Sequence, residues 1–427
     1  MRSETPKHVH PLLGRRLVDW VLEAARGLEP NPLVVVAAPG FVDAFGEVEV
    51  AVQEVPLGTG HALMASRRSL DGHRGDVLVL AGDAALVRPE TLRELLETHR
   101  SSAAAATVLT FRRDDPGSYG RIVRGGNGSI SAIVEATDLT EAERGITELN
   151  SSIYVFNAEK LWPALDQLDS ANAQGELYLT DAVRALVQEG EHVAAHEAEA
   201  GEAEGVNTRV ELAAAGAELR DRINEQHMLA GVTIVDPATT WIEPSVELEA
   251  DATIHPFTVL RGRTRVAAGA EVGPHVVAID AEIGPQVLVG PFCYLRPGTV
   301  LEAGAKAGTF VEIKNSRVGE RTKVPHLSYI GDAEIGAGTN VGAGNITANF
   351  PHEPGKPKTR TTIGDNVRTG VQNAFVAPVE VGEGAWTAAG SVITKDVPPG
   401  ALAVARARQE NKEGFAARGD SGADDDD

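Results

Sequence analysis

Residues 283–301 of this chain read IGPQVLVGPFCYLRPGTVL, with an aliphatic residue at every sixth position. A six-residue period is typical of a parallel β-helix, in which short strands stack coil upon coil and one side chain per hexad fills a continuous core. Glycine often follows the aliphatic residue, as in Ile283-Gly284, and it permits the tight corners of such coils. The same spacing extends through the C-terminal half at Ile254, Leu260, Val266, Val272, Val318, Val324, Ile330, Ile363, Thr369, Phe375, Val381, Thr387 and Ile393. The second half of the chain is therefore predicted to be a parallel β-helix.

The six-residue period is interrupted once, between residues 349 and 362, by a segment rich in proline, lysine and histidine. Loops that break a solenoid commonly carry function, because the rigid coils hold them in place. Hexapeptide repeats occur most often in acyltransferases and nucleotidyltransferases. The repeat therefore favours these two classes of activity, in addition to indicating the fold. A purely structural solenoid is the alternative that the repeat by itself leaves open.

The first half of the chain alternates short apolar runs with amphipathic stretches. Residues 33–38 and 77–81 fit buried parallel strands, and residues 17–28 and 89–98 have helical spacing. This alternation indicates an α/β sheet with helices on both faces. Residues 121–134, with glycines between two apolar runs, predict a hairpin inserted into that sheet.

The composition indicates the cellular compartment of the protein and excludes one class of partner. Because Cys293 is the single cysteine, the chain cannot form an internal disulfide, and we expect a reducing, cytoplasmic setting. The first twenty residues contain no apolar leader, and no stretch approaches the length of a membrane span. The net charge of −22 argues against general nucleic-acid binding, which needs a basic face. Residues 414–427 are predicted to be a disordered acidic tail.

Two stretches of the first half contain residues suited to a nucleotide site. Residues 80–83 (LAGD) place Asp83 directly after an apolar strand, where a carboxylate can hold Mg²⁺ against a triphosphate. Gln53 precedes residues 57–60 (LGTG), whose glycines let backbone N–H groups approach a base or phosphate. An ordinary helix cap and an ordinary glycine turn are the respective alternatives.

His326 is the candidate general base of the second half. Acyl transfer, one of the reactions typical of hexapeptide repeats, needs a group that takes a proton from the attacking nucleophile, and histidine suits that role near neutral pH. His326 lies two residues from the inward position Val324 and close to Tyr329 in the sequence. A structural histidine in the coil is the alternative.

Ordered motifs in both halves carry a resemblance to one enzyme family. They are Gln53, residues 57–62, residues 81–83, residues 119–123, residues 133–135, residues 148–150 and residues 205–207. Together with the hexapeptide half, they resemble the bifunctional bacterial N-acetylglucosamine-1-phosphate uridyltransferase/glucosamine-1-phosphate acetyltransferase. The resemblance covers nearly the whole chain.

For the first half, the resemblance implies a site for UTP and N-acetylglucosamine 1-phosphate. The implied residues are Gln53, Gly58 and Thr59 for the uracil, Lys7 for the phosphates, Gly82 as a further nucleotide contact, Gly120, Glu135 and Asn150 for the sugar, and Asp83 and Asn207 for Mg²⁺. Ala81 departs from the family pattern, because many relatives have Tyr or Ser there and Ala81 supplies only its backbone.

For the second half, the resemblance makes His326 the catalytic base. The implied residues for glucosamine 1-phosphate are Arg296, Lys314, Tyr329, Asn340, Asn349 and Lys356, and those for acetyl-CoA are Ala343, Phe350, Val371, Ala389, Arg406 and Lys412. Phe350 and Val371 lack a hydroxyl that the family usually has, which removes a hydrogen bond worth about 0.5–1.5 kcal/mol each. We therefore expect reduced affinity rather than lost activity.

These patterns predict a Rossmann-like uridyltransferase domain over residues 1–207, a linker helix over 208–230 and a left-handed β-helix acetyltransferase domain over 231–413. The enzyme would acetylate glucosamine 1-phosphate and then transfer UMP from UTP, giving UDP-N-acetylglucosamine for peptidoglycan and other cell-envelope precursors. As in the family, we expect a homotrimer with acetyl-transfer sites between neighbouring β-helices. The alternatives are a monofunctional acetyltransferase and a non-catalytic scaffold, and the joint presence of His326, Lys314 and Asn349 argues against the scaffold.

The family's glycine-rich phosphate loop lies just upstream of the segment that matches residues 1–7. We expect the 427-residue chain to turn over little UTP, because the backbone nest that holds the triphosphate would lie in that upstream loop. Extension upstream through that loop is expected to restore Mg²⁺-dependent release of pyrophosphate.

Overall fold

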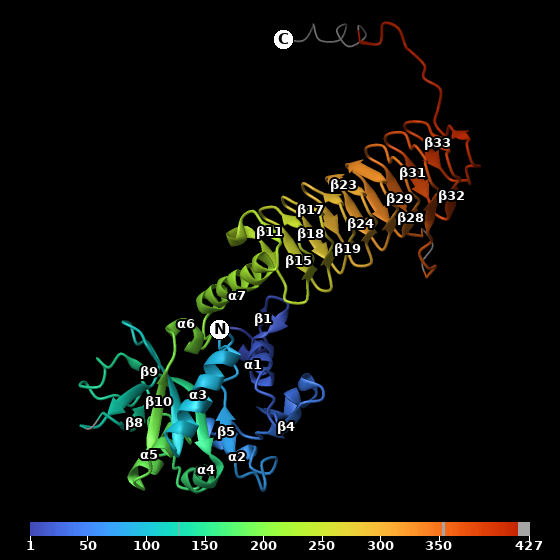
Figure 1. Ribbon diagram of the computed structural model, residues 1–427. Helices are drawn as coiled ribbons and strands as arrows, with labels where there is room; N and C mark the ends of the chain where they lie inside the picture. Colours follow the sequence, from blue (N-terminus) through green and yellow to red (C-terminus); the bar gives the residue numbers. More distant parts are fainter. Residues whose placement is uncertain (127, 352–354, 417–427) are drawn as a thin grey trace, which may run out of the picture. The chain divides into compact units, whose positions relative to one another are not determined.

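The computed structural model describes residues 1–126, 128–351 and 355–416 (Figure 1). The chain forms two compact units, of which the first is Met1–Leu219 and the second begins at Arg220. The predicted acidic tail over residues 414–427 lies outside the described residues from 417 onward.

The first unit contains a six-stranded mixed sheet with the strand order β10-β6-β9-β7-β8, in which β5 also pairs with β9. Its strands are β5 (Asp76–Val79), β6 (Ala106–Arg112), β7 (Arg121–Arg124), β8 (Ile130–Val134), β9 (Glu148–Asn157) and β10 (Val193–Glu197). A parallel pair, β3 (Val34–Ala37) and β4 (Glu49–Val52), is separate from this sheet. The antiparallel β7–β8 pair confirms the predicted hairpin.

Helices cover both faces of this sheet. Successive strand residues point to opposite faces, so each strand contributes side chains to both helical layers. On β9, Phe156 packs in the cluster of α4 and α5, whereas Val155 packs in the cluster of α3. The helices are α1 (Leu17–Arg26), α2 (Thr59–Ala65), α3 (Pro89–Ser101), α4 (Ala158–Leu165), α5 (Leu179–Gln188) and α6 (Ala200–Ala203). The predicted α/β architecture is confirmed. One strand differs from the prediction: residues 77–81 were expected in a parallel strand, but β5 pairs antiparallel with β9.

The helix α7 (Arg209–Leu229) contains the boundary between the two units. In its first half Ala215 and Leu219 are buried in a core cluster of the first unit. In its second half the amide of Asn224 donates to the carbonyls of Pro237 at 3.0 Å and Thr240 at 2.9 Å. The sequence therefore forms a helix where the linker was predicted, and each half of that helix is packed.

The second unit is a parallel β-helix built from three sheets (Figure 1). The first sheet contains β11 (Thr233–Ile234), β14 (Thr253–Ile254), β17 (Glu271–Val272), β20 (Leu288–Val289), β23 (Lys306–Thr309) and β26 (Lys323–His326). The second contains β12 (Trp241–Ile242), β15 (Val259–Arg261), β18 (Val277–Ile279), β21 (Tyr294–Leu295), β24 (Glu312–Lys314), β27 (Tyr329–Gly331), β29 (Ile346–Ala348), β31 (Ala374–Val376) and β34 (Val392–Ile393).

The third sheet contains β13 (Glu247–Leu248), β16 (Arg265–Val266), β19 (Glu282–Ile283), β22 (Val300–Leu301), β25 (Arg317–Val318), β28 (Ala333–Ile335), β30 (Thr361–Ile363) and β32 (Val379–Val381). A short pair, β33 (Trp386–Thr387) and β35 (Leu402–Ala403), follows at the C-terminal end. Every residue of the predicted six-residue series is buried, including the two threonines, Thr369 and Thr387. The hexapeptide prediction is therefore confirmed in the core as well as in the topology.

Among the described residues, no helix is long and apolar enough to cross a membrane.

Candidate functional site

A first group of predicted residues gathers around the ammonium of Lys7 in the first unit. This Nζ atom lies 2.5 Å from Oδ2 of Asp83 and 2.8 Å from Oδ1 of Asn207. Asp83 follows β5, and its backbone carbonyl accepts the N–H of Val206, which holds the 205–207 turn against it. The oxygens of Asp83 and Asn207 thus both accept from the Lys7 ammonium, although the two residues are far apart in the sequence.

This oxygen pair fits a hard divalent cation. Mg²⁺ prefers carboxylate and amide oxygens and usually keeps several waters, so a site with two protein oxygens beside substrate phosphates is sufficient. Gly205 leaves the carboxylate room, since a Cβ atom at that position would lie 3.0 Å from Oδ2 of Asp83. Asp83 and Asn207, which the resemblance implies for Mg²⁺, thus offer oxygen ligands of the kind that this cation prefers.

The predicted uracil residues form a second group at the start of α2. The amide of Gln53 donates to the carbonyl of Gly58 at 3.2 Å, and its Nε2 lies 3.1 Å from Nδ1 of His61. Gly58 has φ of +111°, and a Cβ atom there would meet the carbonyl oxygen of Leu177 at 2.6 Å. Only glycine fits this close approach.

The predicted sugar residues form a third group on β7, β8 and β9. The N–H of Asn150 donates to the carbonyl of Gly120 at 2.9 Å, and a Cβ atom at Gly120 would lie 3.5 Å from Oε2 of Glu135. Burial raises the pKa of the Glu135 carboxyl, while the Thr180 hydroxyl, which donates to Oε1 at 3.2 Å, opposes that rise. The side-chain amide of Asn150 donates to the hydroxyl of Tyr154 at 2.8 Å.

Two residues that the sequence analysis assigned no role connect these groups. Thr180, which donates to Glu135, follows Leu179, whose N–H donates to Oγ1 of Thr59 at 3.0 Å. The start of α5 therefore connects Thr59 with Glu135. Tyr119 accepts the N–H of Gly205 at 3.2 Å and precedes Gly120, and burial raises its pKa to about 12. Tyr119 belongs to residues 119–123, one of the motifs that carry the resemblance, whereas Thr180 belongs to none of these motifs.

In the second unit, His326 heads a column of predicted acetyl-CoA residues. It ends β26, at the corner between the first and second sheets, and its side chain is exposed. Backbone hydrogen bonds align this corner from coil to coil: Gly344 N–H donates to the carbonyl of His326, Gln372 N–H to Ala343, and Gly390 N–H to Val371. His326, Ala343 and Val371 therefore occupy equivalent places in successive coils, and Ala389 continues the series. We name this series the His326 corner.

Bulk at this corner decreases on the C-terminal side of His326. The residues that turn the corner with positive φ are Phe257, His275, Phe292, Phe310 and Leu327 in the earlier coils, and Gly344, Gln372 and Gly390 in the later ones. The side chain of Arg406 lies beside Gly390, with Cδ 3.8 Å from the place a Cβ atom would take. Lys412 is exposed in the segment that follows β35. The Gln372 amide lies over Gly344, with Nε2 2.6 Å from the place a Cβ atom would take, so the corner is open beside Gly390, where Arg406 supplies a cation.

The predicted phosphate and sugar residues lie on the second sheet. Arg296 and Lys314 follow one another in adjacent coils, because Arg296 N–H donates to the carbonyl of Ile313 at 2.8 Å. Glu312 holds the guanidinium of Arg296 at 2.8 Å. Lys314 pairs with Gly331 in the next coil, and the Tyr329 hydroxyl lies over that glycine, in the space that a Cβ atom would take. Arg296, Lys314 and Tyr329 thus form one row.

The remaining predicted residues are placed differently. Asn349 is buried, and its amide donates to Asp332, whose carboxylate lies 4.0 Å from the ammonium of Lys314. Asn340 bridges to Lys323 of β26 and therefore continues the first sheet. Phe350 is exposed, and the Lys358 ammonium lies 5.7 Å from its ring centroid. Lys356 lies in the same period-breaking segment.

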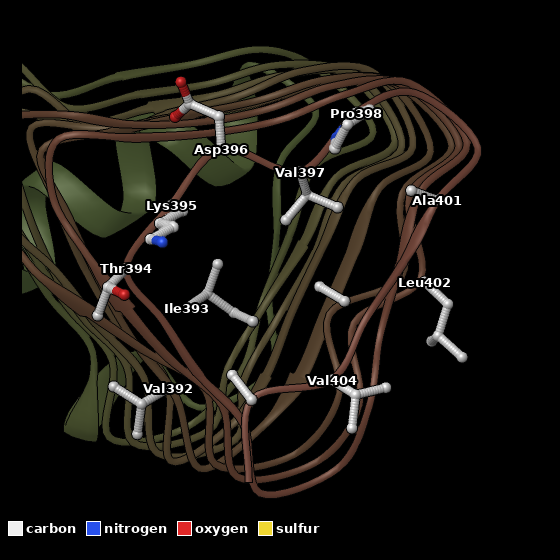
Figure 2. Close-up of a pocket in the computed structure, with 12 residues that line it drawn as sticks. Val392, Ile393, Thr394, Lys395, Asp396, Val397, Pro398, Ala401, Leu402 and Val404 are labelled. Atoms are coloured by element: carbon white, nitrogen blue, oxygen red, sulfur yellow. The ribbon is translucent and has the colours of Figure 1, made fainter.

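A cavity of about 300 Å³ lies at the C-terminal end of the β-helix (Figure 2). Ile393 and Val397 point into it, and residues 392–398 and 401–405 line it. None of the predicted site residues is part of this lining, so the cavity is the open end of the solenoid core and not the candidate site.

Comparisons with known proteins cover both units. A nucleotidyl transferase family model matches residues 5–202. The chain is 48% identical to the bifunctional protein GlmU of Streptomyces avermitilis and 47% identical to that of Streptomyces coelicolor, over 98% of this chain and 92% of each relative. It is 45% identical to the bifunctional protein GlmU of Mycobacterium tuberculosis, over 98% of this chain and 90% of the relative. With identity at this level over almost the full length of each pair, the chain belongs to the bifunctional GlmU family.

Proposed function

We propose that this chain acetylates glucosamine 1-phosphate with acetyl-CoA and then transfers UMP from UTP to the product, giving UDP-N-acetylglucosamine and pyrophosphate. The observation that carries the proposal is that two rows of predicted residues lie at the two edges of one sheet of the β-helix, the second sheet. His326 heads the His326 corner, and the row of Arg296, Lys314 and Tyr329 lies on the adjoining sheet. A base, an acyl-donor track and phosphate-binding cations are the parts that acetyl transfer to an amino sugar phosphate requires.

For acetyl transfer, His326 takes a proton from the substrate nitrogen as that nitrogen attacks the thioester carbonyl. The C–N bond forms, the C–S bond breaks, and CoA leaves as a thiol once it has gained a proton. Arg296 and Lys314 hold the sugar phosphate, for which the planar guanidinium and the ammonium are suited. Gly390 leaves room for the pantetheine arm beside the backbone of Ala389, whereas the Gln372 amide lies over Gly344, next to Ala343.

For uridylyl transfer, a phosphate oxygen of N-acetylglucosamine 1-phosphate attacks the α-phosphorus of UTP, and pyrophosphate leaves. Mg²⁺ held by Asp83 and Asn207 would supply charge stabilisation for the phosphates. Lys7, beside both residues, neutralises further negative charge. Glu135 and Asn150 orient the sugar, and Gln53 orients the base.

A homotrimer is the assembly we propose, because the predicted acetyl-transfer residues divide between two sheets of one protomer. Arg296, Lys314 and Tyr329 lie on the second sheet, whereas Asn340 continues the first sheet. Both sets of residues can contact one ligand when the first sheet of one protomer faces the second sheet of another. A cyclic arrangement of such unlike faces closes after a small number of copies.

An exposed aromatic ladder on the same corner supports self-association. The rings of Phe257, His275, Phe292 and Phe310 stack with centroids 4.8–5.2 Å apart, and the three phenylalanines are 47–57% exposed. Leu327, 59% exposed, continues the series next to His326. Contiguous apolar surface of this kind marks interaction sites. The rings repeat at the spacing between coils, and a second β-helix of the same sequence repeats at the same spacing. We therefore propose that a second copy of this chain covers the ladder.

The double variant Phe292→Asp/Phe310→Asp is expected to dissociate the trimer. Aspartate tolerates the positive φ of both positions, so the corner itself is retained. Loss of two half-buried phenylalanines costs about 2–4 kcal/mol per interface, which weakens association about 30-fold to 1,000-fold. Sedimentation across a concentration series measures this shift. Val235→Asp changes an exposed aliphatic residue outside the ladder and is the control, and an unchanged trimer in the double variant would remove the ladder from the interface.

Two assays on one preparation test the proposed function. Glucosamine 1-phosphate and acetyl-CoA should release CoA thiol, and the isolated product with UTP and Mg²⁺ should release pyrophosphate. Thiol release without any pyrophosphate, both from this chain and from a form extended upstream through the glycine-rich loop, would favour a monofunctional acetyltransferase. Absence of thiol release with any amino sugar phosphate would contradict the proposal.

A further inference from the structure

A buried carboxylate that the proposed mechanism leaves without a role lies beside the acetyl-transfer residues. Asp332 turns the corner between β27 and β28 with φ of +50°, and it is 6% exposed. A charged group is rarely buried to this extent unless its partners compensate the loss of water.

The partners of this carboxylate come from the two coils on either side of it. Asn315, one coil earlier, donates its side-chain amide to Oδ1 at 2.5 Å. Asn349, one coil later, donates its amide to Oδ2. The ammonium of Lys314 lies 4.0 Å from the same Oδ2 atom. Asp332 is thus the shared partner of two residues, Asn349 and Lys314, that the proposed acetyl-transfer site needs.

These contacts keep Asp332 ionised at neutral pH. Burial by itself would raise the pKa of this carboxyl, but the hydrogen bonds from Asn315 and Asn349, with the charges of Lys314 and Lys358, together lower it. An ionised acceptor makes stronger hydrogen bonds than a neutral one, so it fixes the orientation of the Asn349 amide.

We propose that Asp332 is a positioning residue for acetyl transfer: its carboxylate sets the orientation of Asn349 and draws Lys314 towards the same point. This inference rests on the proposed function and adds a residue that touches no substrate itself. It explains why Asn349, which opens the period-breaking segment, is buried and held while Phe350 after it is exposed.

The alternative is that Asp332 only stabilises the corner, and the chain contains a matched control for that alternative. Asp280 turns the same corner in an earlier coil with φ of +47°. It accepts the backbone N–H of Arg263 at 2.8 Å and has no contact with Lys314 or Asn349 among the described residues. The same substitution at 280 and 332 therefore separates corner stability from positioning.

We expect Asp332→Asn to lower kcat for acetyl transfer about 10-fold to 100-fold, the effect of losing hydrogen bonds to a charged group. The KM for acetyl-CoA should change less than about threefold, because the His326 corner is untouched. Asp280→Asn should retain kcat. If the two variants show equal kcat losses, Asp332 has only a structural role and the proposal is overturned.

A double-mutant cycle tests whether Asp332 acts through Asn349. Asn349→Ala alone should slow acetyl transfer, and Asp332→Asn added to it should cause little further loss, because the group that Asp332 orients is already gone. Additive losses would overturn the proposal. An unimpaired Asn349→Ala enzyme would instead contradict the assignment of Asn349 in the proposed function, and the two failures are therefore distinguishable.

An exchange variant decides the question if Asp332→Asn does not fold. Asn315→Asp combined with Asp332→Asn keeps an acid and an amide in contact across the corner but removes the carboxylate from Asn349. We expect this variant to melt close to the unsubstituted chain and still to show the kcat loss. Full acetyl-transfer activity in it would overturn the proposal.

Discussion

His326→Ala is expected to lower kcat/KM for acetyl transfer about 10²-fold to 10⁴-fold, the usual effect of removing a general base. The side chain is exposed at the end of β26, so its loss leaves the β-helix core intact. Release of CoA thiol measures the reaction. Pyrophosphate release should be unchanged, since the groups around Lys7, Gln53 and Glu135 belong to the first unit.

His255→Ala is the matched control for this prediction. His255 also lies on the β-helix, where its Nε2 atom is 2.7 Å from Glu271, away from the predicted substrate residues. We expect near-normal acetyl transfer from it, because a surface ion pair contributes little to stability. A loss of less than threefold in His326→Ala would remove this histidine from the mechanism.

Asp83→Asn is expected to reduce Mg²⁺-dependent pyrophosphate release about 10²-fold to 10³-fold, the scale of losing one preorganised charge-stabilising group. The amide has nearly the size of the carboxylate, so the close packing against Gly205 is retained. What is lost is the negative charge that would hold the cation and that faces Lys7 at 2.5 Å. The comparison is made with the unsubstituted chain, both forms being extended upstream through the glycine-rich loop that uridylyl transfer is expected to need, over a series of Mg²⁺ concentrations.

Asp166→Asn provides the control for the second prediction. Asp166 pairs with Arg67 at 2.7 Å on the surface, where both side chains are about half exposed, and such pairs contribute about 0–1 kcal/mol. CoA release by Asp83→Asn should match that of the unsubstituted chain. If Mg²⁺-dependent pyrophosphate release survives in Asp83→Asn, then Asp83 is not the cation ligand.

Much of the fold follows from local patterns that need no tertiary information. The hexapeptide series is readable because each coil must bury one side chain per face, and burial is confirmed from Ile254 to Ile393. The β7–β8 hairpin and α7 are equally local, since glycines between apolar runs and helical spacing are sufficient to indicate them. The unit boundary is less readable, because both halves of α7 are packed and the division falls at Leu219 within it.

The sites were only partly predictable. Asp83, Asn207 and Lys7 were named individually from the resemblance, but their convergence on one point depends on the backbone of Asp83 binding Val206. Thr180 and Asp332 were missed because a threonine at the start of a helix and an aspartate at a turn are common for ordinary structural reasons. Their significance lies in partners that are distant in the sequence, namely Glu135 for Thr180 and Asn349 for Asp332.

By itself, the sequence determined that the second half coils, which side chains fill its core and which residue types are available for acyl and nucleotidyl transfer. Tertiary structure decided which of those residues share a corner. His326, Ala343 and Val371 align through backbone hydrogen bonds between coils, and the period-breaking segment lies between the last two. Because that segment breaks the six-residue count, the sequence spacing cannot give the register beyond it. The stacking of strands restores that register, since each buried N–H must find its carbonyl in the adjacent coil.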